Sequence, residues 1–125
     1  LAEVYGTGGQ VQEGLRVLTE ALALTSKNGE RWYVAEIYRL QGVLLQAAHE
    51  EPQAEVCFHR ALAAARRQQA RSWELRAAMS LGSLWQRQGQ GAAARALLAT
   101  VYGWFTEGFD TADLQEARAL LEAWR

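Results

Sequence analysis

The side chains best suited to bind a metal ion lie at Cys57 and His59, with Glu55 one helical turn before His59. Thiolate, imidazole and carboxylate groups are common zinc ligands. Residues two positions apart on a helix point about 200° away from each other, so one ion would not reach both Cys57 and His59. His49 could approach from the preceding turn, but a closed zinc site needs further ligands. We therefore interpret Cys57 as structural and both histidines as surface residues, and expect no metal and no cofactor.

A glycine-rich stretch, Gly6-Thr7-Gly8-Gly9, has the composition of a phosphate-binding loop. It lacks the Gly-Lys-Ser/Thr that supplies charge and a magnesium contact, and it follows a predicted helix instead of a strand. We interpret it as a turn. Two histidines and one cysteine also give no Ser–His–Asp or Cys–His–Asn set. We therefore predict that this chain is not an enzyme.

Basic residues cluster in the middle of the chain, where a tryptophan, Trp73, could stack on a base. Glu55 and Glu74 lie among these residues, and the formal net charge of the whole chain is −1. Solvated helix ends therefore explain the cluster better than a nucleic-acid site, which remains the less favoured alternative. The basic residues are Arg60, Arg66, Arg67, Arg71 and Arg76.

The composition indicates an all-α protein. The chain has 125 residues, of which 50% are hydrophobic and 22% charged, with a single proline. This suits one folded domain, spanning residues 1–125, with a core of its own. No apolar run approaches the roughly 20 residues of a membrane span, so we expect no membrane partner.

Small and large residues recur in register along the chain. Gly42 and Gly82 are about 40 residues apart, and Ala54 and Ala94 follow them at one common offset. A similar step places Leu75, Ala78, Leu81 and Trp85 onto Leu114, Ala117, Leu120 and Trp124. The repeats are expected at about 1–29, 30–70 and 71–109, with a terminal helix at 111–125.

Capping residues and apolar periodicity place the helices. We expect the first from about Val11 to Leu24, with a stop at Asn28-Gly29, and the second from Glu30 to Ala48. Pro52 suits the first turn of the third, which runs to about Gln69 with Val56 among its inward residues. The fourth is expected to be capped by Ser72 and to end in the turn at Gly89 and Gly91, the fifth to cover Ala92 to Phe105, and the last to be capped by Asp110 or Thr111.

The recurring small residues indicate where paired helices approach most closely. We expect Gly42 to face Ala54 and Gly82 to face Ala94. A bulky residue at such a contact would overpack it, at a cost of about 1–3 kcal/mol. Gly82→Leu and Ala94→Phe are therefore predicted to destabilise the protein.

Two motifs resemble the tetratricopeptide pattern: Leu81-Gly82-x2-Trp85 followed by Ala94, and Ala54-x3-Phe58 followed by Ala61. The period of about 40 exceeds the usual 34, and the proline that closes the standard repeat is absent. HEAT repeats have periods near 40 but do not explain the small-and-aromatic signature. The resemblance implies an all-α, right-handed superhelix, or α-solenoid, of about three helical hairpins plus a C-terminal helix.

Three longer segments are similar to the C-terminal tetratricopeptide region of large bacterial signalling proteins that combine a cyclase-like domain with an AAA/STAND-type ATPase. They are residues 54–62, 66–81 and 101–114, the last containing Tyr102-Gly-Trp-Phe-Thr-Glu-Gly-Phe-Asp110. This resemblance implies a cytoplasmic bacterial protein with a regulatory role in signal transduction. It transfers no catalytic residue, because no cyclase or ATPase motif is present, and it leaves such domains to other parts of a parent chain.

The tetratricopeptide resemblance also implies a binding surface. In that family the first helix of each pair lines a concave groove that takes peptides or partner helices, so we expect a scaffold that binds a protein or peptide partner of unknown identity. Arginine with methionine and glutamine suits an acidic or amphipathic peptide, while a merely solvated concave face is the alternative. The positions carried over are Glu36, Arg39, Val43, Gln46, Arg76, Met79, Ser83, Gln86, Arg87, Gln115, Arg118 and Glu122.

The two ends suggest a second function. We expect the first helix to lack its beginning, and the last helix, which contains Leu120, Leu121 and Trp124, to have no partner after it. We take the chain as a piece of a longer protein. Exposed apolar ends would favour end-to-end packing, either with another copy as a homo-oligomer or with flanking repeats.

Overall fold

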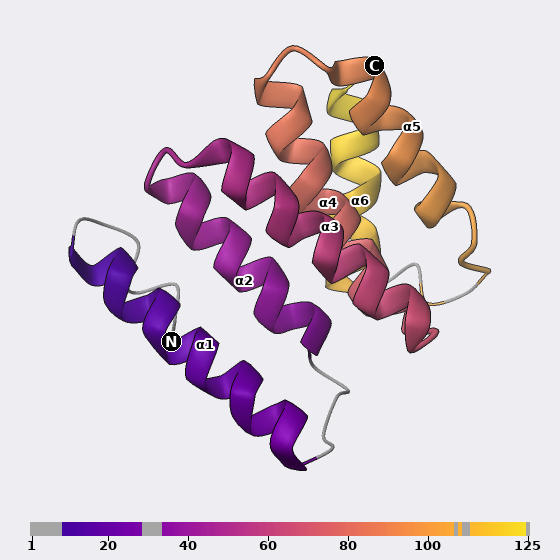
Figure 1. Ribbon diagram of the computed structural model, residues 1–125. Helices are drawn as coiled ribbons and strands as arrows, with labels where there is room; N and C mark the ends of the chain where they lie inside the picture. Colours follow the sequence, from indigo (N-terminus) through magenta and orange to yellow (C-terminus); the bar gives the residue numbers. More distant parts are fainter. Residues whose placement is uncertain (1–8, 29–33, 107, 109–110, 125) are drawn as a thin grey trace.

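The protein is all-helical in a computed structural model that describes residues 9–28, 34–106, 108 and 111–124. No strand occurs among these residues, and none of the described helices is long and apolar enough to cross a membrane. The helices, shown in Figure 1, are α1 (Gly9–Asn28), α2 (Val34–Ala47), α3 (Glu51–Arg67), α4 (Arg71–Arg87), α5 (Gly91–Tyr102) and α6 (Ala112–Ala123).

Three tight turns join α2, α3, α4 and α5 by the same hydrogen-bond pattern. In each, a residue with positive φ follows the helix: His49 (63°), Gln69 (54°) and Gly89 (81°). The next backbone N–H then reaches back five residues, as in Glu50 N to Leu45 O at 2.9 Å. Ala70 N to Ala65 O and Gln90 N to Trp85 O repeat this bond at 2.9 and 2.8 Å. These left-handed helix endings satisfy carbonyls that would otherwise be unpaired and start each new helix at once.

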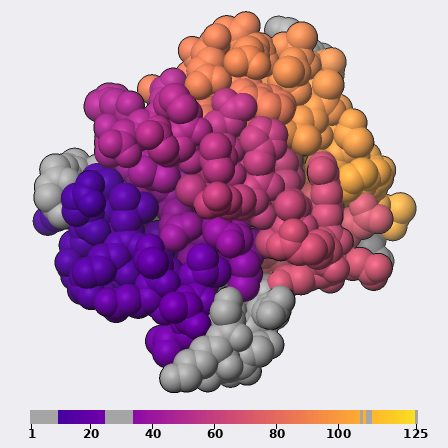
Figure 2. Space-filling view, in the orientation of Figure 1, coloured from indigo at the N-terminus to yellow at the C-terminus, as the bar shows by residue number. Residues whose placement is uncertain are grey.

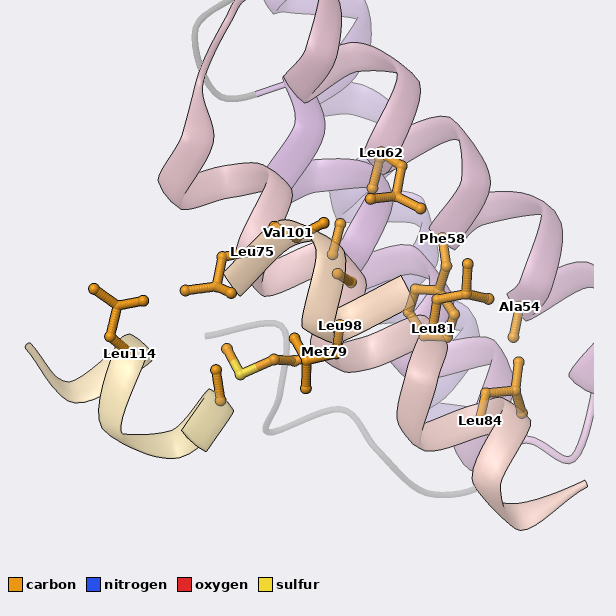
Figure 3. Packing of buried hydrophobic residues seen from close by; sticks show 14 residues of the cluster. Ala54, Phe58, Leu62, Leu75, Met79, Leu81, Leu84, Leu98, Val101 and Leu114 are labelled. Atoms are coloured by element: carbon orange, nitrogen blue, oxygen red, sulfur yellow. The ribbon is translucent and has the colours of Figure 1, made fainter. Parts of the chain in front are cut away.

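The helices pack in sequence order. Each described helix contacts the next one, and α2 also contacts α4, as α4 contacts α6. Figure 2 shows α1 along one edge of the molecule, and α2 is the helix that it contacts. The main core lies where α2 to α6 meet, and Figure 3 shows Phe58, Leu81 and Leu98 within it. Val11 and Leu18 of α1 form a smaller cluster with Ile37 and Leu44 of α2.

Two helical glycines lie where helices approach closely. A Cβ added at Gly42 would come within 2.5 Å of the ring of Phe58, which is fully buried. A Cβ at Gly82 would lie 2.9 Å from Trp124 and 3.6 Å from the carbonyl oxygen of Ala94. Gly82 thus adjoins Ala94 as expected, whereas the atoms nearest to Gly42 belong to Phe58 and not to Ala54.

Several predicted details differ from the structure. Ser72 is not a helix cap, because α4 already begins at Arg71, its N-cap is Ala70, and no side chain caps it. Val56 is 48% exposed and not inward, since the buried stripe of α3 runs through Ala54 and Phe58, each about 200° away on the helix. The helix α1 extends beyond the predicted span at both ends.

Helix α5 begins at Gly91 and ends at Tyr102, so Gly91 belongs to the helix and not to the preceding turn, and the predicted end at Phe105 is wrong. Two other predicted features agree with the structure. Pro52 lies in the first turn of α3, and Thr111 caps α6 by accepting a hydrogen bond from the backbone N–H of Leu114. The predicted start of the second helix at 30–33, the glycine at 29, the alternative cap Asp110 and most of the stretch 6–9 lie outside the described residues. Residues 1–8, which would contain the first helix of the first expected hairpin, also lie outside the described residues.

Candidate functional site

A hollow of about 370 Å³ lies between α2, α4 and α6. We call it the central hollow. Successive turns of α2 and of α4 contribute one wall each, and the side of α6 that faces α4 contributes the third. Its lining residues are Arg39, Val43, Gln46, Phe58, Arg76, Met79, Ser80, Ser83, Asp113, Glu116 and Leu120.

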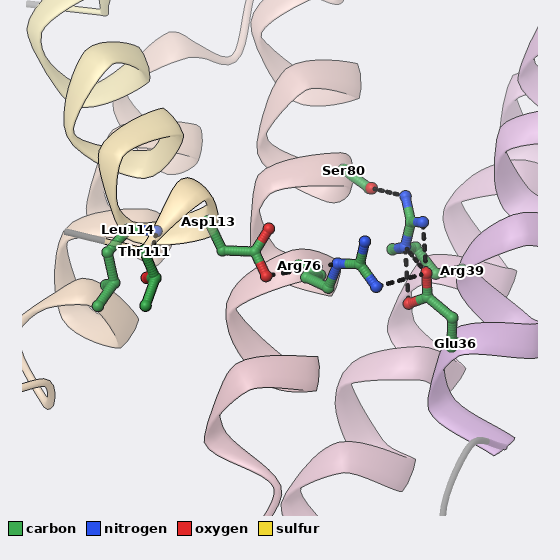
Figure 4. A network of polar contacts seen from close by, with 7 residues as sticks. All are labelled: Glu36, Arg39, Arg76, Ser80, Thr111, Asp113 and Leu114. Carbon is green, nitrogen blue, oxygen red and sulfur yellow. Dashed lines mark hydrogen bonds and ion pairs between the residues drawn. The ribbon is translucent and has the colours of Figure 1, made fainter. Parts of the chain in front are cut away.

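Ion pairs and hydrogen bonds connect the three helices across the central hollow. Arg76 on α4 lies between Glu36 on α2 and Asp113 on α6, as Figure 4 shows. Its Nη1 is 3.0 Å from a Glu36 oxygen and its Nε is 3.6 Å from an Asp113 oxygen. Arg39 donates to Glu36 from Nη2 at 2.5 Å and to the Ser80 hydroxyl from Nη1 at 3.4 Å.

This arrangement decides the electrostatic character of the hollow. The side chains of Glu36 and Arg39 are each only 15% exposed, so their pairing is shielded from solvent. Both arginines already hold carboxylates, while no ion pair within the described part of the chain involves Glu116. With two arginines against three acidic residues, the central hollow carries a formal charge of about −1.

Apolar side chains complete the hollow. Val43 and Leu120 are half-buried, and Met79 is nearly buried with its flexible thioether at the wall. Polar groups from Gln46, Ser80 and Ser83 lie beside them. The combination of an apolar strip with an acidic margin suits an amphipathic ligand better than a purely anionic one.

Seven of the predicted groove residues meet at this place. Six of them line the central hollow, and Glu36 joins it through Arg39 and Arg76. The six are Arg39, Val43, Gln46, Arg76, Met79 and Ser83.

The other five lie elsewhere. Arg87 is 3.7 Å from Glu51 on α3, and Gln86 lies against Gly91 at the start of α5. Arg118 and Glu122 face a separate hollow of about 340 Å³ between α5 and α6, and Gln115 is exposed without lining any hollow described here.

The difference on α6 has a geometric cause. On α6, the predicted residues Gln115, Arg118 and Glu122 each come one position after an inward-facing residue of the helix. The residues that line the central hollow each come one position before an inward-facing residue. Those residues are Asp113, Glu116 and Leu120. Their spacing of three and four residues, next to buried Leu114 and Ala117, could be recognised in the sequence as one side of a helix. Deciding which of the two sides flanking the buried face lines the hollow requires the position of α4.

The other chemically interesting residues are not arranged as a site. Cys57 is buried, and this burial raises the pKa of its thiol, with Arg60 opposing the effect. His59 is exposed, 3.5 Å from Glu55, and its ring lies 5.9 Å from that of Trp85. Across the described residues, no three His, Cys, Asp or Glu side chains gather where a metal ion could be held.

A comparison with protein-family models, with curated proteins and with solved structures gives no match.

Proposed function

We propose that the chain is a tetratricopeptide-like helical-repeat module whose function is to bind a partner protein through the central hollow. Three features support the repeat assignment: the recurring left-handed turns at 49, 69 and 89, the packing of each helix on the next, and the further contacts of α2 with α4 and α4 with α6. On this proposal the protein is a cytoplasmic scaffold of a bacterial signalling system, as the sequence resemblance implies, and not an enzyme.

The observation that carries the binding proposal is the engagement of both arginines. An acidic peptide would have to displace Glu36 or Asp113, and exchanging one carboxylate for another gains little free energy. A basic group finds Glu116 without such competition, and an apolar side chain can rest on Val43 and Leu120. The partner is therefore an amphipathic segment with basic residues, which narrows the sequence-based expectation of an acidic or amphipathic peptide.

Two labelled amphipathic peptides of the same length test this proposal, one made of Leu and Lys and the other of Leu and Glu. We expect fluorescence anisotropy to show tighter binding of the Leu/Lys peptide. Glu116→Gln should weaken that binding severalfold, whereas Glu122→Gln is the matched control, since it removes the same charge from the same helix outside the central hollow. Equal effects of the two variants on binding of the Leu/Lys peptide would contradict the proposal.

Self-association is the second candidate. The hollow between α5 and α6 has half-buried Tyr102 and Leu121 beside Arg95 and Arg118, a mixture that could pack against another copy. Light scattering coupled to size-exclusion chromatography would detect it. A monomer at high concentration would exclude this function, while a dimer disrupted by Leu121→Asp would support it.

A further inference from the structure

A second hollow, of about 660 Å³, lies where the turn between α3 and α4 approaches the segment that follows α5. Figure 1 shows these two segments close to each other at the ends of their helices. We call it the lateral hollow. Its lining residues are Arg66, Gln69, Arg71, Glu74 and Trp104, so it shares none with the central hollow.

Arg71 is held by an aromatic ring instead of a carboxylate. Its guanidinium carbon lies 4.4 Å from the centre of the Trp104 ring, and no ion pair of Arg71 occurs among the described residues. A guanidinium stacked in this way keeps its in-plane N–H groups available for a bidentate bond to a carboxylate. Trp104 is 42% exposed, so part of its apolar ring is also available for contact.

Arg66 is fixed by a different partner. It donates its Nε–H to Glu74 at 2.7 Å, and no described residue accepts a hydrogen bond from its terminal nitrogens. The Glu74 side chain is only 5% exposed and therefore holds Arg66 from within the protein, while the Arg66 side chain is 53% exposed. Two arginines are thus oriented in one hollow with a single buried carboxylate, which leaves a formal charge of about +1.

We infer that the lateral hollow is a binding site for an acidic peptide segment. One carboxylate of the segment would bind the N–H groups of Arg71 in bidentate geometry, Arg66 would add a second charge-assisted hydrogen bond, and a neighbouring apolar side chain would pack on Trp104. The inference does not depend on the proposed function of the central hollow.

A peptide fits this site better than nucleic acid does. Glu74 cancels one of the two positive charges, and a nucleic-acid site would need an extended row of uncompensated cations along the backbone. The site instead offers one net charge beside one aromatic ring, which matches a single carboxylate next to an apolar side chain.

The test uses the full 125-residue chain and a short labelled peptide of alternating Glu and Leu, with an alternating Gln and Leu peptide and a labelled single-stranded oligonucleotide as comparison probes. We expect the Glu/Leu peptide to bind, and Arg71→Ala to weaken binding about tenfold or more, since hydrogen bonds to charged groups are the stronger kind. Arg71→Lys should also weaken it, because lysine keeps the charge but loses the planar fork. Arg60→Ala is the matched control, because Arg60 is an exposed arginine of α3 outside the hollow.

Each outcome decides the inference. Loss of binding in Arg71→Ala and Trp104→Ala, with Arg60→Ala unchanged and all circular dichroism melting curves alike, supports it. Equal weakening by Arg71→Ala and Arg60→Ala would overturn it in favour of nonspecific attraction. Tighter binding of the oligonucleotide, equal binding of the Gln/Leu peptide, or no binding of the Glu/Leu peptide would also overturn it.

Discussion

The contact between Gly42 and Phe58 makes a sharp prediction for protein stability. A Cβ at position 42 would lie 2.5, 2.7 and 3.0 Å from three ring carbons of Phe58, whereas carbon atoms prefer separations of about 3.5–4.0 Å. Phe58 is fully buried in the main core, so its ring cannot move aside without disturbing its neighbours. Gly42→Ala is therefore predicted to destabilise the protein although alanine is the better helix former.

The magnitude follows from two opposing terms. Overpacking in a close-packed core costs about 1–3 kcal/mol, and an overlap of about 1 Å with a fixed ring belongs near the upper end. Replacing glycine by alanine inside a helix regains about 1 kcal/mol. The free energy of unfolding of Gly42→Ala should thus fall by about 2 kcal/mol, measured by urea denaturation followed by circular dichroism.

Two further variants make the measurement specific. Gly91→Ala should leave stability nearly unchanged, because the added Cβ would meet only the end of the flexible Gln86 side chain. Phe58→Leu should rescue part of the loss in the double variant, because the shorter side chain removes the overlapping ring atoms. If Gly42→Ala were as stable as the wild type, or if its effect and that of Phe58→Leu were simply additive, the proposed contact would be refuted.

Three other predictions concern the turns, a cap and the buried thiol. His49→Gly should stabilise the protein by about 0.5–1 kcal/mol and Gly89→Ala should destabilise it by a similar amount, because both positions have positive φ; thermal melting would show shifts of opposite sign. Thr111→Ala should cost about 0.5–1 kcal/mol through loss of the 3.4 Å bond to the Leu114 N–H, measurable in urea, with Thr111→Ser as the variant that retains it. Burial raises the pKa of the Cys57 thiol. The contribution of the buried thiol to the free energy of unfolding should therefore be intact below about pH 8.5 and fall as the pH rises toward the folded-state pKa. Alkylation of this thiol at pH 8 should also be slower in the folded than in the unfolded chain.

The helical class and several boundaries could be predicted because they depend on local signals. Proline at position 52 and threonine at 111 act within one turn of the chain, and the structure places both where the sequence indicates. Gln69 carries no such signal and His49 only a weak one, since histidine is moderately enriched in the left-handed conformation that both adopt and glutamine is not. Their conformation follows from the packing of the helices on either side, which fixes the turn irrespective of the residue type.

The candidate site was partly predictable for a similar reason. The row of predicted residues on α2 and the first part of α4 reaches the central hollow, because those helices have neighbours on both sides. On α6 the register assigns the wrong side of the helix to the hollow, since that side is chosen by contact with α4. In the sequence, Glu74 is recognisable only as one acidic residue in a charged stretch. Its role in orienting Arg66 could not be predicted, because Arg66 lies eight residues away on the other side of a turn.

The charges around Glu36 allow the partner preference of the central hollow to be shifted by design. Glu36 accepts hydrogen bonds from both Arg39 and Arg76, so Glu36→Gln would remove the carboxylate charge that the two arginines share and raise the formal charge of the hollow from about −1 to about 0. We expect this variant to bind the Leu/Lys peptide more weakly and the Leu/Glu peptide more tightly than the wild type, each by severalfold. Glu55→Gln on α3 removes the same charge outside the hollow and should change neither affinity. An unchanged ratio of the two affinities in Glu36→Gln would mean that the network does not govern what binds there.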